Sequence, residues 1–316
     1  MFKKKNLVGK LWLKYTNRPA YKDYKWDLIN YSQFQFTNFL TGADKINDIG
    51  KIKAAADAKG ELNLTHSGNA GDIIYALPTI KRISEITGVP INLYFKLGRP
   101  MDLPNYSSHP LGNVMLNQKM ADMLFPLVRS QAYISKCDIY HDQIIDIDLD
   151  YFRSGLVPMN KGNIARWCSY ITGVSPDLWK RWLLIEPDKN FSDSIVIARS
   201  GRYQNKYIDY SFLNEYDNLK FIGVESEYND IKRFLPLIEW IEVENFLQMA
   251  QIIAGCKFFI GNQSFPYSVA EAMKVPRILE GAYDVINVVP EGEGGYDFFF
   301  QGHFEWLVNN LNSQKK

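Results

Sequence analysis

Residues 257–280, KFFIGNQSFPYSVAEAMKVPRILE, constrain the fold more than any other part of the chain. An apolar run leads into a polar turn at 261–264, a helical pattern follows without a linker, and a second apolar run returns at 275–279. This order predicts two parallel strands joined by a right-handed crossover. Because the first N–H groups of the helix lack intrahelical partners, the turn predicts a site for an anion such as a diphosphate. An ordinary crossover with a capped helix would give the same pattern.

A second turn of similar design lies near residue 70, between a predicted strand at 61–66 and a predicted helix at 72–87. Its residues are His66, Gly68, Asn69, Gly71 and Asp72. We expect Gly68 and Gly71 where the backbone bends tightly, and Asp72 at the start of the helix. Ligands bind at the carboxyl edge of such sheets, so Asp72 is either a helix cap or a general base that faces a cleft. His66 could orient substrate or simply end the strand.

Strand-like and helix-like segments alternate along most of the 316 residues, and 46% of the residues are apolar. The predicted strands are 61–66, 91–96, 144–149, 194–198, 220–224, 238–243, 258–261 and 277–279, and the predicted helices between and after them are 72–87, 118–130, 164–171, 227–237, 246–255 and 304–311. The sequence therefore predicts the α/β class, with two parallel-sheet domains in series. We expect an N-terminal extension at 1–60, a first domain at 61–180 and a second domain at 181–316. Residues 98–113 read as a long loop.

The charge balance limits the possible partners, because 36 Lys and Arg nearly cancel 35 Asp and Glu. No overall field attracts nucleic acid. The three cysteines lack zinc or redox spacing, which favours reduced thiols. The sequence shows no signal peptide and no apolar run of the roughly 20 residues that cross a bilayer. We therefore expect a cytoplasmic protein.

Residues 1–25 carry seven lysines and Arg18 against one acid, Asp23. Apolar positions share one helix face with the period of an amphipathic helix; they are Leu7, Val8, Leu11 and Tyr15. Such a segment predicts weak contact with an anionic membrane surface, so the protein would be peripheral at the inner membrane face. The alternative is a basic arm that packs on its own domain or stays loose.

Two motifs in order resemble bacterial heptosyltransferase-type glycosyltransferases. G-D-x-x-x-x-L-P is met by Gly71, Asp72, Leu77 and Pro78, and residues 246–276 resemble the donor-binding signature of that family. The resemblance implies a GT-B fold, in which two Rossmann-like domains face each other across a cleft. It implies a glycan or glycolipid acceptor on the first domain and a nucleotide-sugar donor on the second, without a metal or other cofactor. It also implies inverting transfer, with Asp72 as the base, in polysaccharide or lipopolysaccharide synthesis.

The same resemblance nominates residues that bind the donor. These are Arg199, Arg202, Lys206, Glu225, Glu227, Asn262, Gln263, Ser264 and Tyr267. The basic residues would bind phosphate oxygens of the donor, and the acids would accept hydrogen bonds from its ribose hydroxyls. The N–H groups of the turn at 262–264 would bind the donor's diphosphate. A solvated basic loop and acids that complement a helix dipole are the simpler interpretations. Asn262 and Tyr267 replace the usual Asp and His of the family, which leaves the nucleotide and the sugar open.

Two other functions remain open. The first is a non-catalytic nucleotide- or sugar-binding protein on the same scaffold. The second is an epimerase or dehydrogenase on twin Rossmann units, against which the missing G-x-G-x-x-G counts. Asp146, Asp148 and Asp150 form D-x-D-x-D, which we interpret as one polar face of an edge strand instead of a metal site. The four histidines lack metal-ligand spacing.

Overall fold

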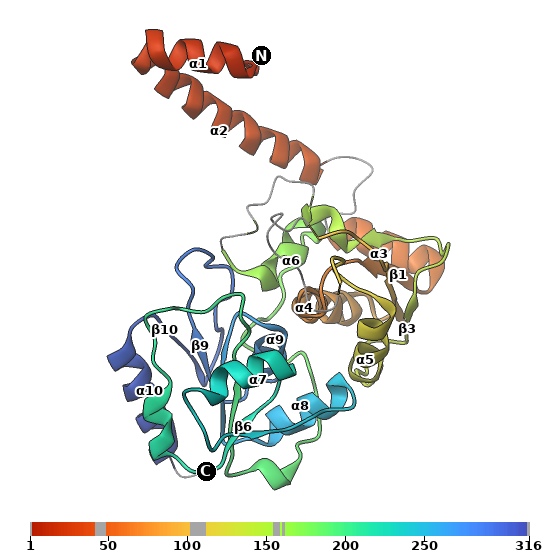
Figure 1. Ribbon diagram of the computed structural model, residues 1–316. Coiled ribbons are helices and arrows are strands. Elements are labelled where there is room, and N and C mark those ends of the chain that lie inside the picture. The colour runs from red at the N-terminus through yellow and green to blue at the C-terminus, as the bar shows by residue number, and fades with distance from the viewer. Residues whose placement is uncertain (1, 42–48, 102–111, 154–158, 160–161, 315–316) are drawn as a thin grey trace.

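The computed structural model describes residues 2–41, 49–101, 112–153, 159 and 162–314. The described residues form two sheets in which every pairing of strands is parallel, each carrying helices on its faces (Figure 1). The first sheet has the strand order β3-β2-β1-β4 and the second the order β10-β9-β8-β5-β6-β7. The strand bounds of the first sheet are β1 (Leu62–His66), β2 (Ile91–Phe95), β3 (Lys136–Ile139) and β4 (Ile147–Asp148). Those of the second are β5 (Ile195–Ala198), β6 (Leu219–Phe221), β7 (Glu239–Trp240), β8 (Phe258–Asn262), β9 (Arg277–Glu280) and β10 (Gly295–Phe298).

The central strands of both sheets are almost fully buried, as expected for parallel strands covered on both faces. All five residues of β2 and of β8 are buried, and β1 pairs with β2 in register from Leu62 opposite Ile91 to His66 opposite Phe95. The predicted α/β class is confirmed. The edge strands β3 and β10 were missed, because each has only four residues and a half-exposed pattern.

The strand predicted at 144–149 was too long, because a 3₁₀ helix, η1 (Leu149–Arg153), begins directly after β4. The three aspartates therefore do not share one strand face. Asp146 accepts a hydrogen bond from the Asn63 backbone and pairs with Lys59, whereas Asp148 pairs with Lys96 at 3.1 Å. Asp150 lies in η1, three residues before Arg153.

Helices cover the sheets and join the two domains. Their bounds are α3 (Ile49–Lys59), α4 (Ala70–Thr87), α5 (Gln118–Arg129), η2 (Ile164–Arg166), α6 (Trp167–Thr172), η3 (Lys189–Phe191), η4 (Ser211–Glu215), α7 (Glu225–Lys232), α8 (Phe246–Gly255), α9 (Phe265–Met273) and α10 (Gln301–Ser313). The predicted helices at 118–130 and 246–255 match α5 and α8. Each begins after an asparagine whose side chain caps the first turn, Asn117 and Asn245.

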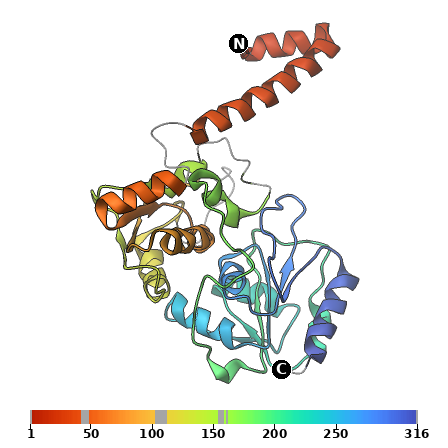
Figure 2. The same ribbon diagram turned by 180° about the vertical axis from the view of Figure 1, so that it is seen from behind.

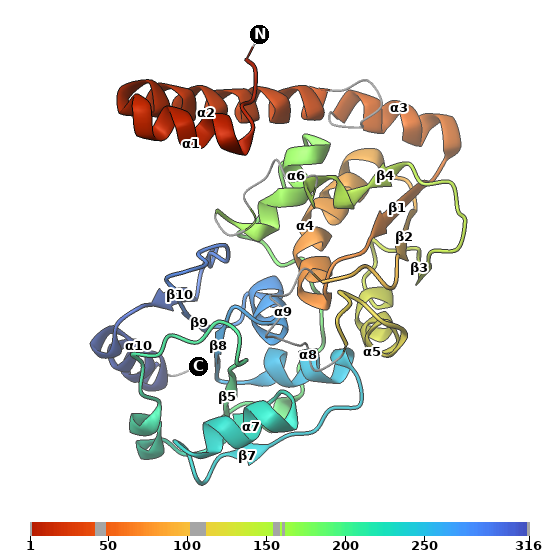
Figure 3. The same ribbon diagram turned by 45° about the horizontal axis from the view of Figure 1, so that its top comes forward.

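The two domains pack directly on each other through helices. α4 of the first domain lies on α9 of the second, and α5 lies on α8 (Figure 3). One apolar core runs through this contact, from the strands of the first sheet to α8, α9 and one face of the second sheet. A second core fills the other face of the second sheet, under α10. The contact brings the first turn of α4 and the first turn of α9 together.

Two helices precede the sheets, α1 (Leu7–Thr16) and α2 (Arg18–Thr41). They lie side by side and stand apart from both sheets (Figures 1 and 2). The extension expected at 1–60 contains a long helix, since α2 has 24 residues. In the described part of the chain, no helix combines the length and apolarity needed to cross a bilayer. Of the loop predicted at 98–113, residues 102–111 lie outside the described part.

Candidate active site

The turn after β1 brings three side chains together around Gly68. A Cβ placed on Gly68 would lie 2.6 Å from Cε1 of His66, 2.6 Å from Nη2 of Arg153 and 2.7 Å from Cβ of Asp72. No side chain fits there, so glycine is required for space. Gly71 was predicted at a bend but lies inside α4, where a Cβ would make only ordinary contacts. That expectation was wrong.

Asp72 lies in the first turn of α4 and is partly exposed, with 17% of its side chain accessible. Its Oδ2 accepts a hydrogen bond from the backbone N–H of Asn69, the residue that precedes the helix, at 3.2 Å. The same oxygen forms an ion pair with Nη2 of Arg153. Asn69 is therefore the N-cap of α4, and Asp72 accepts a hydrogen bond from its N–H from a position three residues into the helix instead of capping the helix itself. Asp72 also carries a charge partner that sequence reasoning missed.

His66 is fully buried beneath this pair. Its Nδ1 accepts a hydrogen bond from the Gly68 N–H at 2.9 Å, and its Nε2 has no hydrogen-bond partner among the described residues. Burial lowers the pKa of His66, and the nearby carboxylate of Asp150 offsets this in part. The imidazole is therefore neutral at pH 7 with its proton on Nε2.

Arg153 also faces a second carboxylate, that of Asp150, with 3.4 Å between Nε and Oδ1. Arg99 approaches the same Asp150 oxygen to 4.0 Å and donates to the Ser67 hydroxyl at 3.1 Å. The pKa of Asp150 is lowered, because the attraction of neighbouring groups exceeds the cost of burial. These residues follow β1, β2 and β4, whose carboxyl ends meet at one sheet edge. Arg99, Asp150 and Arg153 could have been predicted as site residues from the sequence, because each follows a strand that ends at this edge.

The first turn of α9 lies opposite this cluster. A Cβ on Gly71 would come within 3.7 Å of Cα of Phe265 and 3.8 Å of Oγ of Ser268. α9 has Ser264 as its N-cap, without a side-chain capping bond, and Pro266 in its first turn. Proline removes one N–H donor, so the N–H groups of Phe265 and Tyr267 are the donors of this turn.

The polar turn before α9 is tied into the protein. Asn262 is fully buried, and its amide exchanges hydrogen bonds with the Ser200 backbone at 3.0 and 2.7 Å. Its side chain links β8 to the end of β5 and does not face solvent. The Ser264 N–H donates to the Asn262 carbonyl at 2.6 Å, so it is already engaged. Gln263 donates to Asn287 at 2.7 Å, while its Oε1 is buried without a partner among the described residues.

Tyr267, which was expected to contact the donor, does not reach the surface. Its side chain is fully buried between the domains, near the hydroxyl of Tyr75 and the carboxylate of Glu271. Burial raises the pKa of both tyrosines well above the usual value.

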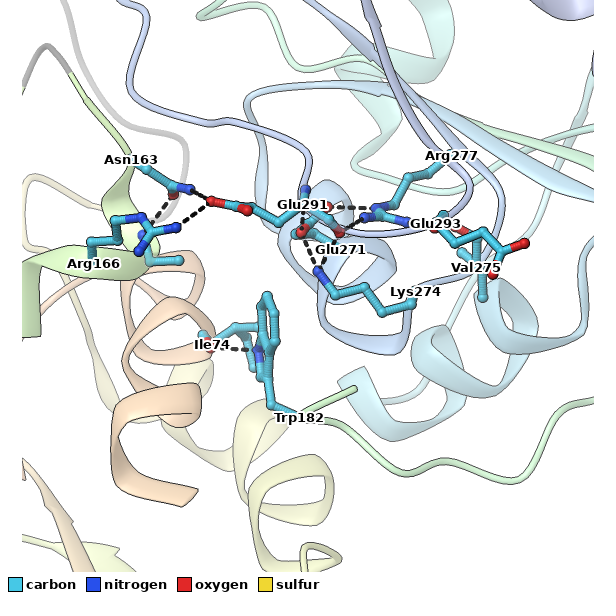
Figure 4. A network of polar contacts seen from close by, with 11 residues as sticks. Ile74, Asn163, Arg166, Trp182, Glu271, Lys274, Val275, Arg277, Glu291 and Glu293 are labelled. Carbon is cyan, nitrogen blue, oxygen red and sulfur yellow. Dashed lines mark hydrogen bonds and ion pairs between the residues drawn. The ribbon is translucent and has the colours of Figure 1, made fainter. Parts of the chain in front are cut away.

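A charged network lies between the two domains (Figure 4). The buried Glu271 pairs with Lys274 and Arg277. Glu291 crosses to the first domain, where its Oε1 accepts from Arg166 at 2.7 Å and from Asn163 at 3.2 Å. These contacts hold the two domains together next to α9.

Arg199 is also directed inward. Its Nε and Nη2 form a two-pronged pair with Glu280, both at 2.7 Å, and its guanidinium lies 4.5 Å from the ring centre of Tyr210. Glu280 is fully buried, so the charge of Arg199 is balanced inside the second domain. Arg199 also lines a cavity beside α7, so its role as a cation for phosphate stays a prediction. Arg202 and Lys206, in the same loop, are exposed.

A cavity of about 550 Å³ lies between this loop and α7. Lys206 and Glu227 line it, together with Tyr207 and Phe234. Burial raises the pKa of Glu227, although backbone hydrogen bonds from Val224 and Gly201 oppose the shift. The volume falls in the range of small-ligand pockets. Glu225 is exposed at the start of α7 and does not line this cavity.

No protein-family model and no curated protein sequence matches this chain. Solved structures match its fold. Heptosyltransferase WaaC of E. coli, solved with ADP, is 10% identical and has a TM-score of 0.55 over 79% of this chain and 99% of its own. ADP-heptose LPS heptosyltransferase II of E. coli is 11% identical, with a TM-score of 0.52 over 80% and 98%. The chain has the GT-B fold of the heptosyltransferases.

Within this GT-B fold, Asp72 and the first turn of α9 lie at the facing edges of the two domains, and the cavity beside Lys206 opens in the second. Among the described residues, no group of three or more His, Cys, Asp or Glu side chains is arranged to hold a metal ion.

Proposed function

We propose that the protein is a glycosyltransferase that moves a sugar from a nucleotide-sugar donor to an acceptor hydroxyl by inverting, metal-independent displacement. The observation that carries the proposal is the meeting of the α4 and α9 N-termini in a GT-B fold, with a carboxylate on one side. The acceptor we propose is a glycan or glycolipid of the cell surface, reached at the inner membrane face. The two E. coli heptosyltransferases support this class of substrate.

In this proposal Asp72 is the general base. Its carboxylate takes the proton of the acceptor hydroxyl while that oxygen bonds to the anomeric carbon and the bond to the nucleoside diphosphate breaks. Arg153 and the Asn69 N–H hold one carboxylate oxygen, Oδ2, and so orient the other toward the acceptor. Because Gly68 has no side chain, the neutral His66 ring, Arg153 and Asp72 can lie close together.

The leaving nucleoside diphosphate would lie on the second domain. Its negative charge is stabilised by the N–H groups of the first turn of α9 and by the exposed cations Arg202 and Lys206. These groups take the place of a metal ion. We assign the nucleoside to the 550 Å³ cavity, where Glu227 accepts hydrogen bonds from ribose hydroxyls.

The decisive variant is Asp72→Asn, which keeps the size of the side chain and removes the base. We expect transfer or donor hydrolysis, screened over a panel of nucleotide sugars in the presence of EDTA, to fall by about 10²- to 10⁴-fold. The thermal shift induced by the matching nucleoside diphosphate should persist. Asp57→Asn, on the exposed face of α3, is the matched control. Full turnover by Asp72→Asn contradicts the assignment of the base.

A second candidate is a non-catalytic nucleotide- or sugar-binding protein. The observations that favour it are the inward side chains of Asn262 and Tyr267, at positions where the resemblance implied donor contacts. Stabilisation by nucleotides without turnover of any donor in the panel would support this function over transfer.

A further inference from the structure

The apolar face of α1 points away from the helix that supports it. At 100° per residue, Leu7, Leu11, Tyr15, Val8 and Trp12 occupy one arc of about 140°. All five side chains are exposed, from 44% for Leu11 to 80% for Tyr15, and no residue of α1 is buried. The opposite face contacts α2 and is half-buried. A helix that packs only within its own protein has the reverse arrangement.

The pair of helices is nevertheless held by caps and by side-chain contacts. Asn6 caps α1 by accepting from the Gly9 N–H at 2.8 Å, and Asn17 caps α2 by accepting from the Ala20 N–H at 3.1 Å. The Lys5 N–H donates to the hydroxyl of the buried Tyr24 at 3.1 Å, and Phe2 stacks on the ring of the same tyrosine. The apolar arc is therefore presented by a folded support.

The charge around the arc identifies its partner. Seven lysines and Arg18 lie within residues 1–25, with Asp23 as the one acid. A second copy of this segment would bring the same positive charge against itself, which disfavours self-association. Anionic lipid attracts the lysines, and the Trp and Tyr rings suit the boundary between headgroups and acyl chains.

We propose that α1 docks on an anionic membrane surface, with the arc of Leu7, Val8, Leu11, Trp12 and Tyr15 in the interface and the lysines at the headgroups. This apolar patch is the kind of exposed surface that marks an interaction site. Docking would place the GT-B domains at a lipid surface, and it needs neither donor nor acceptor. Its failure is therefore separable from a failure of sugar transfer.

The test is flotation of the full-length protein with unilamellar vesicles. We expect binding to vesicles of phosphatidylcholine with phosphatidylglycerol, and at least about tenfold weaker binding to phosphatidylcholine alone. Raising the salt from about 0.05 M to about 0.5 M should release most of the protein. The double variant Leu7→Glu/Leu11→Glu should lose about tenfold in binding, because it puts carboxylates into the arc.

Leu237→Glu is the matched control, since Leu237 is 93% exposed on the second domain and should not affect binding. Circular dichroism of the double variant checks that the helices persist, and the salt dependence of the unmodified protein tests the charge independently. Absence of flotation with anionic vesicles would overturn the proposal. Flotation that does not change in the double variant would also overturn it. So would a protein that does not bind vesicles but forms a concentration-dependent dimer that the double variant abolishes.

Discussion

Arg153 and Asp72, 81 positions apart in the sequence, form an ion pair at the carboxyl edge of the first sheet. Arg153 is nearly buried, with 6% of its side chain exposed, and Asp72 retains access to solvent. The guanidinium also faces Asp150, so one cation serves two carboxylates. The position of the proposed base thus depends on a residue from a 3₁₀ helix far along the chain.

Replacement of Arg153 by Met should destabilise the protein. The change leaves Asp72 without its cation and Asp150 with only Arg99, 4.0 Å away, in a mostly buried site. Breaking a buried pair costs on the order of 3 kcal/mol. Urea unfolding measures the loss. Arg82→Met is the control, because the Arg82–Glu85 pair is 39% and 42% exposed and should contribute less than about 1 kcal/mol. Equal effects of both variants would show that the Asp72 pair is not a buried structural pair.

Glu280→Gln should be strongly destabilising but should not act through the donor site. The Glu280 carboxylate accepts from Arg199, the Asn205 N–H and the Tyr210 hydroxyl with no solvent contact. An amide in its place leaves the Arg199 charge uncompensated, at a cost of about 3–5 kcal/mol. Lys206→Ala should do the opposite, weakening nucleotide binding while the urea midpoint stays unchanged. Reversed outcomes would favour Arg199 over Lys206 as the ligand of phosphate.

Gly255→Ala should test the close approach of the backbone at Asp188 to α8. A Cβ there would lie 1.9 Å from the backbone oxygen of Asp188, whose own N–H is held by Gln251. Because backbone cannot move aside as a side chain can, we expect a loss of about 3 kcal/mol in the free energy of unfolding. Gly302→Ala, in open space at the start of α10, should be neutral or stabilising by up to about 1 kcal/mol. Similar values for both glycines would contradict the observed packing.

The fold was predictable where a short stretch of sequence determines the structure. α5 and α8 follow from an apolar period of 3.6 and an asparagine cap, and the crossover at 257–280 follows from strand, turn and helix signals in series. The edge strands β3 and β10 were not predictable, because four residues with half-exposed patterns carry little periodicity.

The site was predictable only as positions along the chain. Asp72 and the α9 turn were found because local motifs mark strand ends. The directions of side chains were not. Arg199 turns inward to pair with Glu280, 81 positions away in the sequence, and Tyr267 is buried in the core between the domains. The pairing of Arg153 with Asp72 has the same origin, since no local pattern couples residues 81 positions apart. The domain boundaries proposed from composition stay predictions.

The interdomain network gives a prediction for alkaline pH. Burial, more than any neighbouring charge, lowers the pKa of Lys274 to about 8, although Glu271 partly opposes it. Lys274 also lies 4.5 Å from the ring centre of Trp182 and donates to the Glu291 carbonyl at 2.8 Å. In the unfolded chain the lysine keeps its proton up to about pH 10.4. Between these values the unfolded state binds more protons than the folded state.

Stability should therefore rise with pH across this window, by up to about 1.4 kcal/mol per pH unit from this group. The measurement is the free energy of unfolding in urea for the unmodified protein minus that for Lys274→Met, from pH 6 to about pH 10. The difference should be flat below about pH 7 and should then increase in favour of the unmodified protein, because the buried ammonium that opposes folding is lost. The subtraction removes every titration that the two proteins share, including those of Tyr75 and Tyr267. A difference that stays constant to pH 10, or that falls, would mean that Glu271 and the Trp182 ring compensate the burial of Lys274 in full.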